Sequence, residues 1–530
     1  AVRCSIRTGT FPVPQNAFPP RNEKHPYPTP PPRTRPTLRR PTTLRSAPQY
    51  GNKPAPPSAS TRCQPANILR PAQGISYNRD MPFYKDRVFQ WIFISLALCK
   101  AAAFACLLGL HPLGENILAF PDSLTYIYPA QTFLQYGQMW EAVSVSPMLL
   151  RTPGYPAFLA LIQLVVGNLT WAVAAAQNLL SLVLLVPVYL TAYRLSGQTA
   201  ARWAAGFCAA SVLYFTLSFA VLTETLCVFL LAWFCYYIVC FLQQPNGRNL
   251  AAAAVWLAAA VYVRPAAYYF MFAAAVMLVC FSAGKLVRFP ARKIVLFFVL
   301  PLVLCIAPWH VRNAVKTGFG GFTSVGAYNL YIWNEDYLAH EENISVEQAH
   351  NALQNALPPG FDALPPAQQV RLYKAGAAPL IKAGFAYKLL RAPLWAAKTL
   401  FGANFVHLSR LLSGGIDEEN LDSQMLNQTA ALHARWLQGW KEKGLFILAA
   451  GQVFVTVLLG IFGFGLGWKT QRAAVFFLAV YCLYFWAIGS TFFGAYARFR
   501  APFEFVLCIL AGITAARLWE QRKRLFQRSK

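Results

Sequence analysis

Charged residues are scarce in this 530-residue chain: they make up 13% of it, against 56% hydrophobic residues. Acidic residues are the scarcest, with 20 Asp and Glu against 47 Lys and Arg. So low a charge content is not that of an ordinary soluble protein. Many near-continuous apolar runs of about 17–25 residues predict instead an all-α polytopic integral membrane protein.

Other absences narrow the class of protein. The polar segment 310–443 has no cysteine, and ten of the twelve lie in apolar stretches from Cys99 to Cys508, so we expect no disulfide framework. Without a P-loop or GxGxxG context, a soluble nucleotide donor is not indicated. Without a His/Cys/Asp cluster at metal-ligand spacing, no cofactor is required, although a divalent ion at Asp122 or Glu224 stays open.

The formal net charge of +27 does not indicate a nucleic-acid partner. Much of it lies in short loops, where positive charge sets membrane topology, and in residues 1–80. Those residues hold 17 of the 37 prolines and cannot bury a core, so we expect a disordered tail or upstream translated sequence. A chain starting at Met81 should then insert and work like the full chain. A transit peptide and a Pro-rich docking arm are the alternatives.

Hydropathy predicts about ten membrane spans with both chain ends in the cytoplasm. The expected spans are about 88–110, 171–193, 203–222, 225–242, 250–263, 266–284, 294–309, 445–467, 473–492 and 501–518. Residues 155–167 form a segment too short to cross, which we expect to dip into the outer leaflet as a helix.

We expect the following organisation. Residues 81–309 form an N-terminal transmembrane module whose loop, 111–154, is catalytic. Residues 310–443 form a small extracytoplasmic α-rich subdomain, for acceptor recognition or as a spacer, ending in an amphipathic helix on the membrane. Residues 444–530 form the last transmembrane helices and a basic cytoplasmic tail.

The positive-inside rule supports this topology. The side taken as cytoplasmic receives Lys85, Arg87, Arg194, Arg202, Arg248, Lys285, Arg288, Arg292, Lys293, Lys469, Arg472 and the segment from Arg517 to Lys530. The opposite side receives Asp122, Arg151, Glu224, Arg264, His310, Arg312, Arg498 and Arg500. Arginine at a single helix end is often only a membrane anchor, and Glu224 could be a buried partner of one arginine. Together, however, these arginines stand where positive charge is normally depleted.

Arginines grouped beside carboxylates suit phosphate chemistry. Arginine binds phosphate oxygens in bidentate fashion, and fixed cations stabilise the charge that a departing phosphate gains. A carboxylate next to an acceptor hydroxyl or amine can act as a general base. We therefore predict Asp122 and Glu224 as catalytic residues. The predicted phosphate-binding residues are Arg151, Arg264, Arg498 and Arg500, and the supporting ones are Tyr155, His310, Arg312, Asn313, Tyr496 and Glu504.

Six motifs in this order resemble a known family. They are Asp122 in the first loop, Arg-Thr-Pro-Gly-Tyr-Pro at 151–156, Thr-Glu at 223–224, Arg-Pro at 264–265, Pro-Trp-His-Val-Arg-Asn at 308–313, and Ala-Arg-Phe-Arg-Ala-Pro at 497–502. Between about Phe83 and Trp519 the chain resembles bacterial glycosyltransferases of the GT-C superfamily. It is most similar to the lipid-carrier-dependent branch of protein O-mannosyltransferases and lipid A aminoarabinose transferases (glycosyltransferase family 39).

The resemblance implies a GT-C type bundle with outer-face juxtamembrane helices, in the inner membrane of a bacterium. It also implies a polyprenyl-phosphate-linked sugar donor and an active site facing the periplasm. An essential acid in the first outer loop of the family falls on Asp122, and the second outer acid falls on Glu224. Mannosyltransferases often have a second acid at the position of Ser123, so a protein-mannosylating specificity is not implied.

We therefore expect an inverting glycosyltransferase with Asp122 as base, acting on an unidentified glycolipid, cell-envelope glycan or protein. A transporter or flippase of lipid-linked glycans is the alternative from another class. It should show internal repeats and charges near the bilayer midplane, and neither is evident in the sequence. A non-catalytic lipid-binding scaffold is a third interpretation, and it would not need Asp122.

Overall fold

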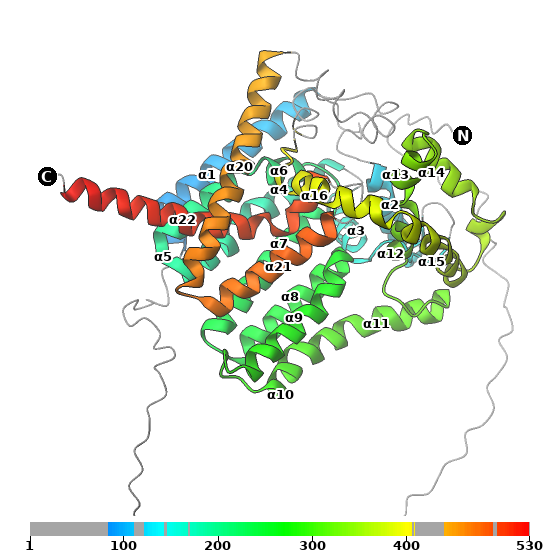
Figure 1. Cartoon of the computed structure of the whole chain (residues 1–530), viewed down its shortest axis with the longest axis horizontal. Helices are drawn as coiled ribbons and strands as arrows, with labels where there is room; N and C mark the ends of the chain where they lie inside the picture. Colours follow the sequence, from blue (N-terminus) through cyan, green and yellow to red (C-terminus); the bar gives the residue numbers. More distant parts are fainter. Residues whose placement is uncertain are drawn as a thin grey trace, which may run out of the picture. The chain divides into compact units, whose positions relative to one another are not determined.

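The computed structural model describes residues 83–110, 121–141, 146–167, 170–404, 408, 439–490 and 496–528. The predicted tail, residues 1–80, lies outside this part of the chain. The described residues are almost entirely helical (Figure 1), with one isolated antiparallel bridge between Trp140 and Pro147. The predicted all-α class is confirmed.

The first half of the chain forms short and long helices in series. They are η1 (Phe83–Lys85), α1 (Arg87–Leu110), α2 (Pro121–Tyr136), α3 (Gly154–Val166), α4 (Thr170–Val183), α5 (Leu185–Ala209), α6 (Val212–Leu217), α7 (Glu224–Gln243), α8 (Gly247–Val263) and α9 (Ala266–Ala283). The segment predicted as a loop, 111–154, thus contains the 16-residue helix α2. The expected short helix after it is present as α3.

The second half begins with α10 (Ala291–Ile294), the π-helical turn η2 (Val295–Val299) and α11 (Leu300–Thr317). It continues with α12 (Val325–Ile332), α13 (Glu335–Glu341), α14 (Val346–Asn355), η3 (Phe361–Ala363), α15 (Pro366–Ala383), α16 (Phe385–Phe401), α20 (Trp440–Trp468), α21 (Arg472–Ser490), η5 (Ala497–Arg500) and α22 (Ala501–Arg528). Helix α11 continues to Thr317, past the boundary expected at 309, so the polar segment starts on a continuous helix.

Eight helices of the described chain are long and apolar enough to cross a membrane, which makes the protein a multi-pass membrane protein. The prediction was about ten. The difference arises because α4 and α5 form one continuous apolar stretch, Thr170–Ala209, and because α8 has only 17 residues. The span expected at 203–222 is wrong in its boundaries, since α5 ends at Ala209 and the short α6 ends at Leu217.

Helix α5 consists of two helical pieces that meet at Gly197, where φ is 83° and ψ is −175°. Essentially only glycine adopts this backbone conformation. Tyr189 and Arg202, on either side of it, both donate to the carboxylate of Asp86, at 2.6 and 2.9 Å. In one straight helix these residues would lie about 20 Å apart, at 1.5 Å per residue. The helix axis therefore bends sharply at Gly197, within the stretch Thr170–Ala209 that counts as one apolar span.

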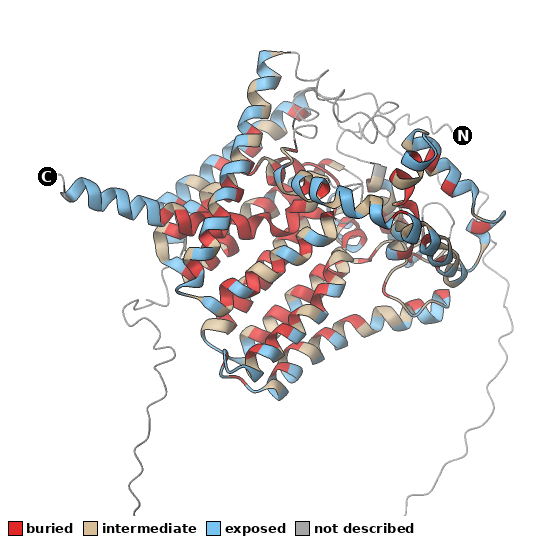
Figure 2. Cartoon of the chain, viewed as in Figure 1, coloured by how far each residue is buried: buried red, intermediate tan, exposed pale blue. Residues whose placement is uncertain are grey.

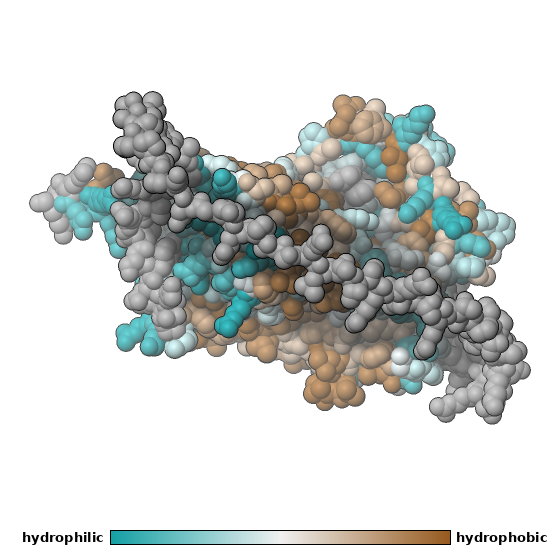
Figure 3. All heavy atoms as spheres, turned by 90° about the horizontal axis from the view of Figure 1, so that it is seen from below, coloured by the Kyte–Doolittle hydropathy of each residue, from teal (hydrophilic) through white to brown (hydrophobic). Residues whose placement is uncertain are grey.

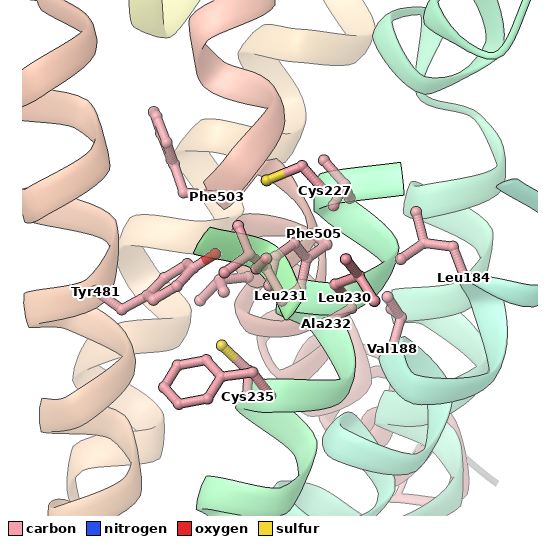
Figure 4. Close-up of a cluster of buried hydrophobic side chains, with 14 of the residues drawn as sticks. Leu184, Val188, Cys227, Leu230, Leu231, Ala232, Cys235, Tyr481, Phe503 and Phe505 are labelled. Carbon is pink, nitrogen blue, oxygen red and sulfur yellow. The ribbon is translucent and has the colours of Figure 1, made fainter. Parts of the chain in front are cut away.

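The core of the bundle is built around α7, together with α5 and α22 (Figure 2). Side chains of α7 pack against Tyr481 of α21 and against Phe503 and Phe505 of α22 (Figure 4). Much of the visible outer surface is apolar as well: hydrophobic residues gather in the middle and lower part of the face shown in Figure 3, and many large hydrophobic side chains of the described chain are exposed. A bundle that is apolar both inside and outside is the pattern of a membrane-embedded protein.

Helices α12 to α15 have a small core of their own, formed by Tyr331, Ile332, Leu353 and Ala377. Polar bonds reinforce it, such as the hydrogen bond from the Tyr331 hydroxyl to the Leu353 carbonyl at 2.8 Å. A capping box formed by Ser345 and Gln348 begins α14, and it satisfies two backbone N–H groups at the N-terminal end of the helix. The α-rich character expected for the polar segment is present over these helices.

Candidate active site

Asp122 lies among charges that come from distant parts of the chain. It is the second residue of α2, in the first turn, where the helix dipole favours a carboxylate. The Nη2 atom of Arg151 donates to Asp122 Oδ1 at 2.9 Å, and the Nη2 atom of Arg498 donates to Oδ2 at 3.1 Å. Each carboxylate oxygen thus has its own arginine, one from the segment before α3 and one from η5.

A second, more deeply buried ion pair stands beside the first. Glu224 is the first residue of α7, and its Oε1 lies 2.7 Å from Nη1 of Arg264, which follows α8. The ring of Phe499 connects the two pairs, with the guanidinium of Arg264 at 5.9 Å and that of Arg498 at 5.6 Å from its centroid. The structure thus brings together both predicted carboxylates and three of the four predicted phosphate-binding arginines.

The electrostatics of the group favour the ionised forms. Burial raises the pKa of Asp122, but Arg498 and Arg151 outweigh it, so the pKa lies below the ordinary value of 3.8. Burial lowers the pKa of Arg264, but Glu224 more than offsets this effect, and the net shift is upward. With three arginines and two carboxylates, these five side chains leave one excess positive charge for an anionic ligand.

The backbone of residues 148–150, just before Arg151, is held from three directions. Glu141 Oε1 accepts two of its N–H groups, at 2.5 and 2.6 Å. Arg312 Nη1 donates to the Met148 carbonyl at 2.6 Å. The Thr323 hydroxyl donates to the two following carbonyls, at 2.9 and 2.7 Å. These bonds fix the position of Arg151 relative to Asp122. Arg312 therefore serves to hold this backbone rather than to bind the predicted phosphate.

Gly154 allows the Arg151 segment to approach the end of α8. A Cβ atom at Gly154 would lie 2.6 Å from the carbonyl oxygen of Tyr262 and 2.9 Å from the amide nitrogen of Val263. We expect Gly154→Ala to lower the free energy of unfolding by about 1–3 kcal/mol, because backbone must move to admit the methyl group. Gly326→Ala, where nothing lies within 4 Å, is the matched control. Equal thermal unfolding of the two purified variants would contradict the close approach.

Hydrogen bonds from polar side chains hold the non-helical segment 218–223 in place. The Ser123 hydroxyl donates to the Val221 carbonyl at 2.7 Å, and Gln177 Nε2 donates to the Ala220 carbonyl at 2.6 Å. Tyr155, predicted as a supporting residue, donates its hydroxyl to Gln177 Oε1 at 3.0 Å. This segment leads directly into Glu224, so the network sets where α7 begins.

Lys100 adds a charge to this network from the interior of α1. It is 3% exposed, and its Nζ donates to Asn178 Oδ1 at 3.0 Å and to Ser218 Oγ at 2.6 Å. The rings of Phe215 and Phe219 lie 4.9 and 5.7 Å from the same nitrogen. An ammonium group inside a membrane helix is costly unless it is satisfied in this way.

Arg500 does not join the Asp122 group. It is 1% exposed, and its Nε lies 2.7 Å from Glu504 Oε2 on the next turn. Its Nη1 donates to the carbonyls of Thr399, Leu400 and Gly402 at the end of α16. The pair of Arg500 and Glu504 therefore attaches the end of α16 to the start of α22, and the Nε and Nη1 atoms of the guanidinium are committed to this contact.

The remaining predicted residues shape the border of the site. Asn313 Nδ2 donates to the carbonyls of Gly321 and Phe322, at 2.9 and 3.0 Å, and closes the turn after α11. His310 lies in hydrogen-bond contact with the Tyr268 hydroxyl and the Gly320 carbonyl. Tyr496, by contrast, lies next to the charges, with the Arg498 guanidinium 5.6 Å from its ring centroid.

Sequence reasoning missed Glu141 and Lys100. Glu141 was detectable because acids are scarce and it is one of few between α1 and α3. Lys100 was detectable as a lone charge in the middle of an apolar run. Among the residues that the structure describes, no group of three or more His, Cys, Asp and Glu side chains could hold a metal ion.

Residues 150–310 match a family model described as dolichyl-phosphate-mannose-protein mannosyltransferase. The matched stretch contains Arg151, Glu224 and Arg264. Over these residues the predicted resemblance to lipid-carrier-dependent glycosyltransferases is confirmed. The match to this family ends at His310, so Arg498 and the last three candidate membrane helices of the described chain lie beyond it.

Solved structures of GT-C enzymes are similar to this chain at low identity. The archaeal oligosaccharyltransferase AglB from Archaeoglobus fulgidus, in complex with an inhibitory peptide and a dolichol-phosphate, has 10% identity and a TM-score of 0.44, and the match covers 84% of this chain and 52% of that one. The chain thus spans about half the length of AglB. ArnT from Cupriavidus metallidurans has 14% identity and a TM-score of 0.36 in the apo state, with 82% and 78% covered. ArnT bound to undecaprenyl phosphate has 12% identity and a TM-score of 0.37, with 81% and 78% covered. A comparison with curated proteins found no match.

Proposed function

We propose that this protein is a glycosyltransferase of a bacterial inner membrane that moves a sugar from a polyprenyl-phosphate-linked donor to an acceptor on the extracytoplasmic side. The observation that carries the proposal is the carboxylate of Asp122 between Arg151 and Arg498, beside the pair of Glu224 and Arg264. A general base and phosphate-binding cations are the two components that such a reaction needs. The match of residues 150–310 to lipid-carrier mannosyltransferases supports it.

In the proposed reaction the acceptor oxygen or nitrogen attacks the anomeric carbon of the sugar. The bond from that carbon to the phosphate oxygen breaks, and its electron pair stays on the lipid phosphate. Asp122 takes the proton of the acceptor, and the arginines stabilise the phosphate charge that develops. Direct displacement inverts the anomeric centre. Arginine provides the positive charge, so the proposal requires no cofactor, and transfer in the presence of EDTA tests whether a divalent ion at Asp122 contributes.

Arg498 connects donor binding to the strength of the base. A carboxylate with two arginine partners is a weak base, because both lower its pKa. A donor phosphate competes with Asp122 for Arg498 through stronger, bidentate hydrogen bonds. Asp122 then keeps only Arg151, and its pKa rises when the donor is bound. The base thus gains strength when a donor is in place.

The pH dependence of kcat/KM tests this connection. Because the pKa of Asp122 is lowered in the free protein, its carboxylate is already ionised above the ordinary value of 3.8, and activity should fall only as the pH drops through the lowered pKa. Arg498→Ala removes one of the two lowering charges, so we expect the acid limb to move to higher pH. An acid limb at the same pH in both proteins would contradict the coupling of Arg498 to Asp122.

The identity of the acceptor is open to direct measurement. Ser123 occupies the place of a second acid, and its buried hydroxyl is committed to the Val221 carbonyl, so protein is not favoured over a glycolipid or a cell-envelope glycan. Mass spectrometry of glycolipids and glycoproteins from a deletion strain identifies the product that disappears. Unchanged envelope glycans in that strain, together with lost transport of a lipid-linked sugar, would favour a transporter.

A further inference from the structure

Lys398 is a cation that the sequence analysis did not assign to the site. It lies in the last turn of α16 and is half-buried, and burial alone lowers the pKa of its ammonium group. The structure shows no ion pair or hydrogen bond of its Nζ with any described residue. That nitrogen faces the ring of Tyr496, at 5.8 Å from the centroid. A desolvated cation without an anion is unfavourable and binds an anionic ligand readily.

Tyr496 places Lys398 beside the Asp122 group. The guanidinium of Arg498 lies 5.6 Å from the centroid of the same ring, so both cations lie against one aromatic side chain. Arg498 in turn contacts Asp122 at 3.1 Å. An anion at the edge of Tyr496 would therefore meet Lys398 and Arg498 together, next to the proposed base.

Hydrogen bonds hold the C-terminal end of α16 in place, and they thereby position Lys398. Arg500 Nη1 donates to the carbonyls of Leu400 and Gly402, at 3.0 and 2.8 Å. Trp486 Nε1 donates to the Ala396 carbonyl at 3.0 Å. These contacts bracket Lys398 on both sides along the helix, so its backbone cannot move away without breaking bonds to α21 and η5. The side chain is presented to Tyr496 by a fixed turn of helix.

Unlike Lys398, the three arginines of the site have carboxylate partners, and Arg498 shares Asp122 with Arg151. Arg151 is paired with Asp122 and Arg264 with Glu224, at 2.9 and 2.7 Å. We propose that Lys398 and Arg498 together hold the phosphate of the polyprenyl-phosphate donor, across the ring of Tyr496. Arg151 then stays with Asp122 and keeps the base ionised and oriented. This assignment rests on the proposed function and deepens it, because it divides the cations into a phosphate pair and a base partner.

Arg500 is unsuited to the phosphate for a geometric reason. Arg500 and Arg498 are two residues apart in a 3₁₀ helix, where successive residues are about 120° apart, so they point in different directions. Arg500 binds the end of α16, and that contact brings Lys398 to Tyr496. One arginine positions the lysine, and the lysine completes the pair with the other arginine.

Binding of undecaprenyl phosphate to the full-length protein in nanodiscs tests the proposal, with undecaprenol as the uncharged probe. We expect Lys398→Ala to weaken binding of undecaprenyl phosphate by about tenfold to a hundredfold, as for a lost hydrogen bond to a charged group. Binding of undecaprenol should not change. Lys398→Arg should retain most of the affinity. Lys382→Ala, at an exposed lysine of α15, is the control and should bind as the unaltered protein does.

Undiminished binding of undecaprenyl phosphate by Lys398→Ala would overturn the assignment. So would equal weakening for undecaprenol, or an effect confined to the KM for the acceptor, which would place Lys398 at the acceptor. The thermal midpoint of the ligand-free variant separates lost binding from misfolding, and Lys398→Gln serves where the alanine variant is unstable. If the unaltered protein bound undecaprenyl phosphate no better than undecaprenol, the proposed function itself would fail. Specific binding that ignores Lys398 would remove only this inference.

Discussion

Replacing Asp122 with asparagine is expected to lower the single-turnover rate of sugar transfer by about a hundredfold to ten-thousandfold, the usual cost of a lost general base. The amide keeps the size of the carboxylate and one acceptor oxygen, so Arg151 and Arg498 retain part of their contacts. Donor binding should persist, because Arg498 no longer has a charged partner and remains available for the phosphate. Purified protein in lipid allows both quantities to be measured, donor binding at equilibrium and transfer in one turnover.

Asp362→Asn provides the matched control, since it makes the same substitution at an exposed carboxylate in η3. It should transfer sugar at the normal rate. Transfer by Asp122→Asn at a similar rate would mean that Asp122 serves only as an ionic partner of the two arginines. The cluster of Asp122 with its two arginines would then only stabilise the fold. Glu224 would be the next candidate for the general base.

Replacing Arg500 with alanine should unfold the protein more readily, with a loss of about 3–5 kcal/mol in the free energy of unfolding. The substitution leaves Glu504 buried without its cation and leaves the terminal carbonyls of α16 without their donor. Denaturant or thermal unfolding of the detergent-solubilised protein measures the loss. Arg517→Ala is the control on the same helix: its pair with Glu520 is exposed and 3.8 Å long, and such pairs contribute little.

A double substitution separates the two tasks that Arg500 could have. Arg500→Met with Glu504→Leu removes both buried charges and should recover much of the stability, because an apolar pair can replace a buried ion pair. Donor binding by the refolded double variant then reports on phosphate contact alone. Normal stability of Arg500→Ala combined with weak donor binding would restore Arg500 to the phosphate site.

The membrane bundle was predictable from composition because several apolar runs of spanning length in one chain are typical of membrane proteins and rare in soluble ones. Asp122 and Glu224 were predictable for a related reason: acids are rare in this chain, so each one beside an apolar helix is conspicuous. The short helix α3 was also expected from its length. Helix α2 was not, because its polar residues suggested a loop, whereas the structure shows a helix of 16 residues.

The sequence did not show which arginine contacts which carboxylate. Arg498 and Arg500 are alike in type and nearly adjacent, and only the 3₁₀ geometry of η5 sends one to Asp122 and the other to Glu504. Lys398 was hidden for the opposite reason. It is one of several basic residues on an amphipathic helix, and its isolation from any described anion emerges only when α16 is placed against Tyr496.

During synthesis, α1 enters the membrane before the side chains that stabilise Lys100 exist. Asn178 and Ser218 follow Lys100 by 78 and 118 residues. A lysine at the centre of an inserting helix costs about 2.5–3.5 kcal/mol, which the apolar remainder of α1 must offset until those partners arrive. The contacts that satisfy Lys100 in the folded protein therefore form only after α4 and the residue that follows α6 have been translated.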